Sequence, residues 1–152
     1  MTGGPAVDIP FATKEALFSA LKAEFKGTRV SVTWADPGAD QTRRSVWFTE
    51  TVEPELEPVA MVAGRRKPTN LTAELTIRMV AAEAGDPIHA ERAALALKSA
   101  VVELVLAFQP TSVAGLVDLR PIRSLTTIGE HAILGTASQC DVTIRVRARL
   151  QS

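Results

Sequence analysis

The stretch that decides the fold is residues 70–80, which read NLTAELTIRMV. Its apolar side chains alternate strictly with polar ones, which is the pattern of a β-strand with one buried side and one solvent-facing side. The apolar set is Leu71, Ala73, Leu75, Ile77 and Met79. Because strands of parallel sheets are usually buried on both faces, a strand with one polar side favours an antiparallel sheet.

Further strand signals lie on both sides of this stretch. Residues 29–35 and 44–52 precede it, and residues 116–128 and 140–150 follow it. A loop with Gly129 and Gly135 is expected before the last strand. Pro54 and Pro58 enclose an acidic stretch that is predicted to be an edge or a loop, because proline cannot donate to a sheet ladder. Residues 59–63 are predicted to form a short strand.

Two segments carry helix signals. The first is predicted to begin at its cap Thr13 and to end near Lys26. The second follows the pair Asp86-Pro87, an N-cap followed by a proline in the first turn, and ends near Phe108. The order of helix, strands, helix and strands predicts an α+β fold, with an antiparallel or mixed β-sheet and two main helices packed on one face.

The length of 152 residues is about that of one domain. Residues 1–10 are rich in Gly and Pro and are predicted to be a flexible N-terminal arm, and residues 11–152 a single α+β domain. The formal net charge of zero argues against a general nucleic-acid binder, which is expected to be basic. Residues 1–64 hold 6 basic and 9 acidic side chains, and residues 65–152 hold 11 and 8, so one acidic and one basic face are possible.

No constellation of residues with catalytic or metal-binding spacing is found. His89 and His131 are the only histidines, and neither has a second ligand at metal-like spacing. Phosphate-binding glycine loops and nucleophile-elbow motifs are missing from the sequence. The single cysteine, Cys140, is expected to be a buried thiol. We therefore expect no enzyme activity, no cofactor, no metal, no membrane span and a cytosolic site of synthesis.

The second helix has apolar residues on two sides. Its predicted core side, placed on a helical wheel, consists of Ala90, Ala93, Leu97, Val101 and Leu104. A second apolar line, formed by Leu95, Val102 and Leu106, lies within the polar arc. Since a helix that is apolar on two sides is usually covered on both, this line is a candidate subunit interface. The alternative is cover by a loop of the same chain.

Two basic features are candidate partner-facing or DNA-facing sites. Arg145, Arg147 and Arg149 alternate along one side of the last strand and repel one another unless they face acids or anions. They suit an acidic partner or a nucleic-acid backbone, or else a solvated sheet face that discourages edge pairing. The second feature is a predicted protruding loop that carries Arg65, Arg66 and Lys67. It is either solvated or docked to an acidic partner.

The sequence as a whole resembles the tail terminator (tail-completion) proteins of long-tailed phages and phage-derived particles. The resemblance covers residues 11–150 and lies in the layout. A short opening helix leads directly into residues 29–34, RVSVTW; a long alternating strand ends at Val80; Gly85-Asp86-Pro87 opens an Ala-rich helix; and a Gly-containing turn precedes the closing strand.

This resemblance implies a structural virion protein without catalytic residues, at the head-proximal end of the tail. It implies a homohexameric ring that caps the tail tube, stops its polymerisation and joins the head-completion or stopper proteins. DNA would pass through the ring without sequence recognition, and assembly would take place in the host cytoplasm. The alternatives are another neck or tail-tube ring component, a monomeric cytosolic ligand-binding or accessory domain, and a small hydrolase.

Overall fold

The computed structural model describes residues 8–53, 57–58 and 69–150. Helices and strands follow in this order along the chain: α1 (Ile9–Glu24), β1 (Ser31–Thr33), the 3-10 turn η1 (Gly38–Asp40), β2 (Arg44–Val52), β3 (Glu57–Pro58), β4 (Thr69–Ala82), α2 (Pro87–Ala107), the 3-10 turn η2 (Pro110–Ser112), β5 (Leu116–His131) and β6 (Gly135–Leu150).

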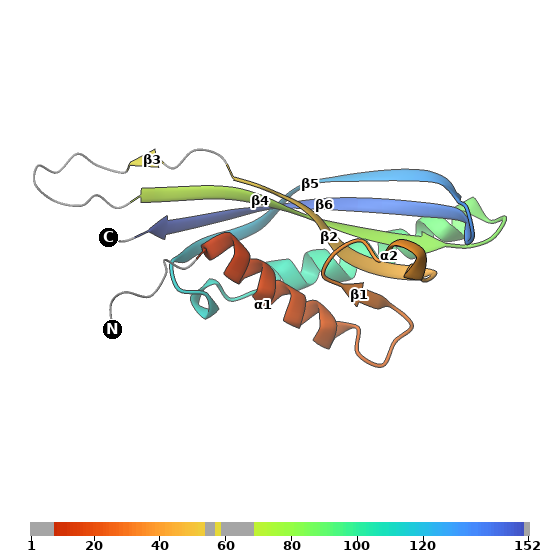
Figure 1. Cartoon of the computed structure of the whole chain (residues 1–152), viewed down its shortest axis with the longest axis horizontal. Helices are drawn as coiled ribbons and strands as arrows, with labels where there is room; N and C mark the ends of the chain where they lie inside the picture. The colour runs from red at the N-terminus through yellow and green to blue at the C-terminus, as the bar shows by residue number, and fades with distance from the viewer. Residues whose placement is uncertain (1–7, 54–56, 59–68, 151–152) are drawn as a thin grey trace, which may run out of the picture.

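The strands of the described residues form one mixed sheet in the order β1-β2-β4-β6-β5, with the short β3 also paired to β4 (Figure 1). Only the pair β1–β2 is parallel; the others are antiparallel. The two long strands β4 and β6 lie at the centre and run beside each other from Thr69↔Leu150 to Ala82↔Ala137. This arrangement confirms the predicted α+β class and the mixed form of the sheet.

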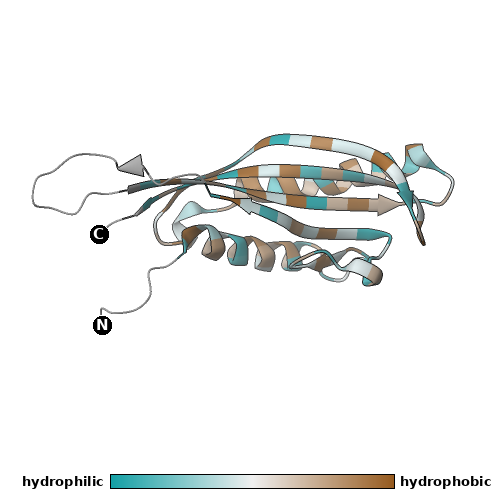
Figure 2. Cartoon of the chain, turned by 45° about the horizontal axis from the view of Figure 1, so that its top comes forward, coloured by the Kyte–Doolittle hydropathy of each residue, from teal (hydrophilic) through white to brown (hydrophobic). Residues whose placement is uncertain are grey.

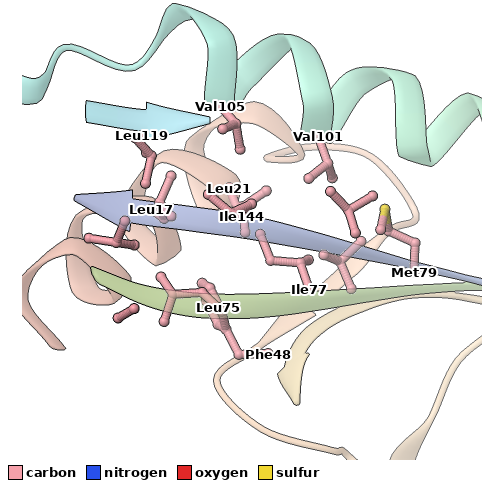
Figure 3. Close-up of a cluster of buried hydrophobic side chains, with 14 of the residues drawn as sticks. Leu17, Leu21, Phe48, Leu75, Ile77, Met79, Val101, Val105, Leu119 and Ile144 are labelled. Atoms are coloured by element: carbon pink, nitrogen blue, oxygen red, sulfur yellow. The ribbon is translucent and has the colours of Figure 1, made fainter. Parts of the chain in front are cut away.

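Both helices cover the same face of the sheet. Leu17 and Leu21 of α1 and Val101 and Val105 of α2 belong to one hydrophobic cluster with strand residues such as Ile144. Figure 3 shows these helix side chains reaching toward β4 and β6 from above and behind the strands. The predicted packing of two helices on one face is therefore confirmed.

The two faces of the sheet follow directly from the alternation in β4 and β6. In the register of these strands, Ile77 lies opposite Val142 on the helix side, and the next pair, Arg78 and Asp141, lies on the other side. Figure 2 shows the resulting alternation of hydrophobic and hydrophilic residues along the strands. The face opposite the helices is therefore polar, and we call it the open face.

Helix α1 begins earlier than predicted. Asp8 is its N-cap and accepts a hydrogen bond from the backbone N–H of Phe11 at 2.9 Å, and Pro10 lies in the first turn. Residues 8–10, which composition assigns to the N-terminal arm, thus form the cap and the start of the helix; residues 1–7 lie outside the described residues. Thr13, the predicted cap, is fully buried instead. The sequence signal at Asp8 is hidden because its first-turn proline stands in a Gly- and Pro-rich stretch.

Helix α2 starts as predicted, with Asp86 accepting from the N–H of His89 at 2.9 Å and Pro87 in the first turn. Its buried stripe differs slightly from the predicted one and consists of Ala90, Ala94, Leu97, Val101 and Val105. Ala93 and Leu104 are only partly buried against the core. The helix is therefore rotated slightly about its axis compared with the orientation that the helical wheel predicts.

The last two strands are longer than predicted. Gly129 pairs with Ala137 inside the β5–β6 ladder, so only the segment between His131 and Gly135 forms the turn. Gly135 has φ 83°, a left-handed conformation that glycine adopts without a Cβ penalty. Glu57 and Pro58 form the short strand β3 at the edge of β4. The predicted strand at residues 59–63 lies outside the described residues.

The central ladder should dominate stability. Ile144 of β6 is fully buried on the helix side of the sheet, so Ile144→Ala should lower the free energy of unfolding by about 2–5 kcal/mol. Leu125, which is 62% exposed on β5, provides the matched control. Leu125→Ala should change the free energy of unfolding by less than about 0.5 kcal/mol. Urea denaturation followed by circular dichroism checks both; similar losses would contradict this assignment of the core.

Candidate interaction surfaces

The open face of the sheet carries a group of arginines, which we call the arginine face. Arg145, Arg147 and Arg149 project from β6 and are all exposed, in agreement with the alternation in the sequence. The neighbouring strand β5 adds Arg120, which lies opposite Arg145, and Arg123, opposite Thr143. Both of these are also exposed. Three predicted arginines thus become part of a larger basic surface spread over two adjacent strands.

Acidic residues neutralise only part of this surface. Arg123 contacts Glu74 at 2.9 Å, and Arg120 contacts Asp118 at 3.3 Å. Within the described part of the chain, the three β6 arginines take part in no ion pair. Since guanidinium groups bind phosphate and carboxylate in a bidentate fashion, the β6 row is chemically suited to an anionic partner.

Arg78 and Asp141 have a structural role on the same face. Nε and Nη2 of Arg78 donate to the two carboxylate oxygens of Asp141 at 2.9 and 3.0 Å. The hydrogen bond to Asp141 raises the pKa of Arg78 above its ordinary value, and burial opposes this. The pair joins the two central strands and is therefore distinct from the exposed arginine row.

A groove lies at the end of the arginine face where β4 and β6 meet β5. It has a volume of about 330 Å³, and two of the exposed arginines lie along it. Its lining residues are Asn70, Leu71, Thr72, Val117, Arg147, Ala148 and Arg149. The groove is an open, mixed polar and apolar surface with positive charge, which suits a charged segment of a macromolecule.

A second hollow lies at the opposite end of the open face. Its volume is about 260 Å³, and it includes Trp47, Arg78, Glu130 and His131. Nδ1 of His131 accepts the backbone N–H groups of residues 133 and 134 at 3.1 and 3.0 Å, so that nitrogen holds the β5–β6 turn. Trp47 is only 3% exposed and forms a covered floor. These groups have structural tasks, and the hollow presents no nucleophile paired with a base.

Metal-ligating side chains do not gather within residues 8–53, 57–58 and 69–150: no group of three His, Cys, Asp or Glu there is placed to hold an ion. The thiol of Cys140 is fully buried, as predicted, and lies 3.3 Å from the Thr126 hydroxyl. In the same part of the chain, no helix is both long enough and apolar enough to cross a membrane.

The second apolar line of α2 is only partly exposed. Leu95 and Val102 are half-buried and pack against the core of their own chain, whereas Leu106 is 66% exposed. Intrachain packing thus accounts for much of the line, and Leu106 is its main accessible residue. Its role as a subunit interface stays a prediction. The other basic feature, Arg65, Arg66 and Lys67, lies outside the described residues.

Sequence patterns missed Arg120 and Arg123 because β5 is irregular. The register of β5 against β6 shifts between Leu116 and Asp118 and again between Pro121 and Arg123. Each shift moves the following side chains to the other face, so alternation read along β5 does not place its arginines beside those of β6. A proline inside a strand was the available signal, since it indicates an edge strand or a bulge.

Comparison with known proteins shows a similarity of fold and no match in sequence. Neither a protein-family model nor a curated protein matches the chain. The fold is similar to that of a chain in the solved structure titled "Virion of native gene transfer agent (GTA) particle", with a TM-score of 0.60 at 16% sequence identity. The match covers 95% of this chain and 100% of the other. The two chains therefore share an architecture over essentially their whole length.

The arginine face allows a clear test of structural against surface roles. Replacing Arg145, Arg147 and Arg149 together by Gln should change the free energy of unfolding by less than about 1 kcal/mol, because these side chains are exposed and, among the described residues, take part in no ion pair. Asp141→Ala should lower it by about 1–3 kcal/mol, because it strands a half-buried guanidinium. Chemical denaturation measures both, and unfolding of the triple variant would assign the row to internal stabilisation.

The second apolar line of α2 permits a similar test, which separates core packing from a role as a subunit interface. Leu95→Asp should lower the free energy of unfolding by about 1–3 kcal/mol, since Leu95 packs against the core, whereas Leu106→Asp should change it by less than about 0.5 kcal/mol. If the line is a subunit interface, Leu106→Asp also lowers the mass of the assembly in sedimentation. An unchanged assembly would leave the line to intrachain packing alone.

Proposed function

We propose that this chain is a structural virion protein, and specifically a tail terminator that caps the tail tube and joins it to the head-completion proteins. The observation that carries the proposal is the likeness of its whole fold to a chain of a gene transfer agent virion, with 95% of one chain and 100% of the other aligned. A match over the full length of both chains supports a shared architecture rather than one shared motif.

A second line of support is independent of that comparison. The sequence layout, with a short helix, a long alternating strand, an Ala-rich helix after Asp86-Pro87 and a closing strand, resembles tail terminators on its own. The observed elements α1, β4, α2 and β6 occupy these positions. A terminator would act through its surfaces, and the exposed arginine face is one such surface.

The proposed assembly is a homohexameric ring at the head-proximal end of the tail, formed in the host cytoplasm. One face of the ring would contact the tail-tube protein and the other a head-completion or stopper protein. DNA would pass through the central hole without sequence recognition. The arginine face suits that last role, because phosphate contacts from guanidinium groups carry affinity but no base information.

The deciding experiment is a tube-capping assay. Purified tail-tube protein is allowed to polymerise with and without this chain, and tube lengths and ends are measured by negative-stain microscopy. A terminator shortens the tubes and leaves a ring at one end. Native mass at several concentrations, measured in parallel, reports whether rings also form in solution.

Other outcomes favour the rival functions. Self-assembly into long tubes would assign the chain to the tail tube, and discrete rings that do not cap tubes would indicate another neck component. A monomer that neither caps nor binds tubes, and that binds a small molecule in the hollow near Trp47, would favour a ligand-binding domain.

The arginine face should make DNA contact non-specific and sensitive to salt. The logarithm of the duplex-binding constant should fall linearly with the logarithm of salt concentration, with no preference between unrelated sequences. Replacing Arg145, Arg147 and Arg149 by Gln should make that slope shallower by about 1 for each phosphate that the variant no longer neutralises. Fluorescence anisotropy at several salt concentrations measures it. An unchanged slope would remove DNA from the roles of this face.

A further inference from the structure

The sheet ends on one side in a long edge strand. β5 spans 16 residues and, in the described part of the chain, pairs only with β6. After the bulge at Pro121 and Arg123 its pairing runs without interruption to His131. The backbone groups on the outer side of this stretch form a regular row that another strand can join.

The side chains of this stretch are also exposed. Leu125, on the open face, is 62% exposed, and Ile128, on the helix side, is 51% exposed. Arg120 and Arg123 accompany Leu125 on the open face. The β5 edge therefore combines an unpaired backbone with apolar side chains and two arginines, each of which also contacts an acidic residue of its own chain.

The opposite side of the sheet offers a different edge. β1 is only three residues long and covers β2 from Ser45 to Trp47. From Phe48 to Val52, β2 pairs with β4 on one side, with a bulge between Phe48 and Thr51, and, among the described residues, with no strand on the other. This part of β2 is a second place where the sheet can be extended.

The side chains around the β2 edge differ in charge from those of β5. Glu50 and Glu53 are exposed, and Val52 is 50% exposed beside them. On the helix side, Phe11 is 51% exposed and lies with Thr51 and Glu53 along a hollow of about 250 Å³. The β2 edge thus carries apolar and acidic side chains, and Lys14 lies along the same hollow.

We propose that the β5 edge of one copy of the chain pairs with the β2 edge of the next copy, head to tail. Because β2 and β5 run in opposite directions in the sheet, the two edges pair antiparallel when the open faces of both copies lie on the same side. In this direction Leu125 lies near Glu50 and Val52, and Arg123 and then Arg120 lie toward Glu53. This inference rests on the proposed function, since it names the interface by which the terminator would assemble.

A second copy is the favoured occupant because the two edges complement each other in charge and apolar character and belong to the same chain. An interface between two different patches is heterologous, so it yields a ring if the rotation closes and a filament if it does not. Two identical β5 edges, in contrast, would bring basic side chains together. The edges therefore favour head-to-tail assembly, as a ring or a filament, over a two-fold dimer.

Charge exchange tests this pairing. One variant carries Arg120→Glu and Arg123→Glu, and the other carries Glu50→Arg and Glu53→Arg. Either variant alone faces like charges at every interface. An equimolar mixture restores opposite charges at each interface when the two copies alternate.

Two controls separate the interface from folding. Glu74→Gln removes the intrachain partner of Arg123 and leaves the side chains of both edges themselves unchanged. The Arg145, Arg147 and Arg149 to Gln variant removes charge from β6, an inner strand of the same sheet. Circular dichroism first establishes that every variant is folded.

The expected result, from sedimentation at concentrations up to about 1 mM, is assembly of the wild type and both controls. Each charge variant alone should need at least about tenfold more protein for half-assembly, and the mixture should recover. A wild-type chain that stays monomeric throughout, an assembly insensitive to either reversal, or a mixture that does not recover would overturn the edge pairing. Unfolding of a reversed variant is resolved by Leu125→Ser and Val52→Ser, which must weaken assembly if the edges pair.

The proposed function is judged separately in the tube-capping assay. Capping by a chain whose assembly ignores both charge reversals would overturn the edge pairing and leave the terminator role standing. Edge-paired rings that fail to cap tubes would overturn the terminator role and leave the edge pairing standing.

Discussion

The pairing of β4 with β6 is the constraint on which the rest of the structure depends. Each strand alternates apolar and polar side chains, and their register keeps the apolar residues of both on one side from Leu71↔Ala148 to Met79↔Cys140. A shift of one residue would expose the whole apolar set. This register therefore determines where α1 and α2 pack and which face stays open, and it gathers the arginines of β6 on that face.

Much of this arrangement was predictable, because the strongest elements carry local signals that agree with the final packing. The alternation in residues 70–80 predicts β4, and Asp86-Pro87 predicts the start of α2. The predicted start of α1 is wrong because Asp8 and Pro10 stand in a Gly- and Pro-rich stretch that favours an arm. Composition also favours a loop at Gly129, but this residue pairs with Ala137 inside the β5–β6 ladder. That pairing depends on a partner strand, which local composition does not reveal.

The surfaces were less predictable than the fold. Exposure of Arg145, Arg147 and Arg149 followed from simple alternation. The addition of Arg120 and Arg123 depended on two bulges in β5, which only the register with β6 defines. On α2, a helical wheel treats Leu95, Val102 and Leu106 as equivalent, but the core beneath the helix half-buries the first two. Such differences arise from the shape of neighbouring elements, which no single segment encodes.

The placement of the two tryptophans makes this chain its own optical reporter. The sequence has no tyrosine, so its near-ultraviolet absorption and emission come almost entirely from Trp34 and Trp47. Trp34 lies among Phe11, Phe18 and Phe48 with the Lys14 ammonium 4.3 Å from its ring centroid, close to the β2 edge. Trp47 lies on the open face of the sheet instead. Single-tryptophan chains would thus give separate spectroscopic signals for events at the edge and on the open face, without an attached dye.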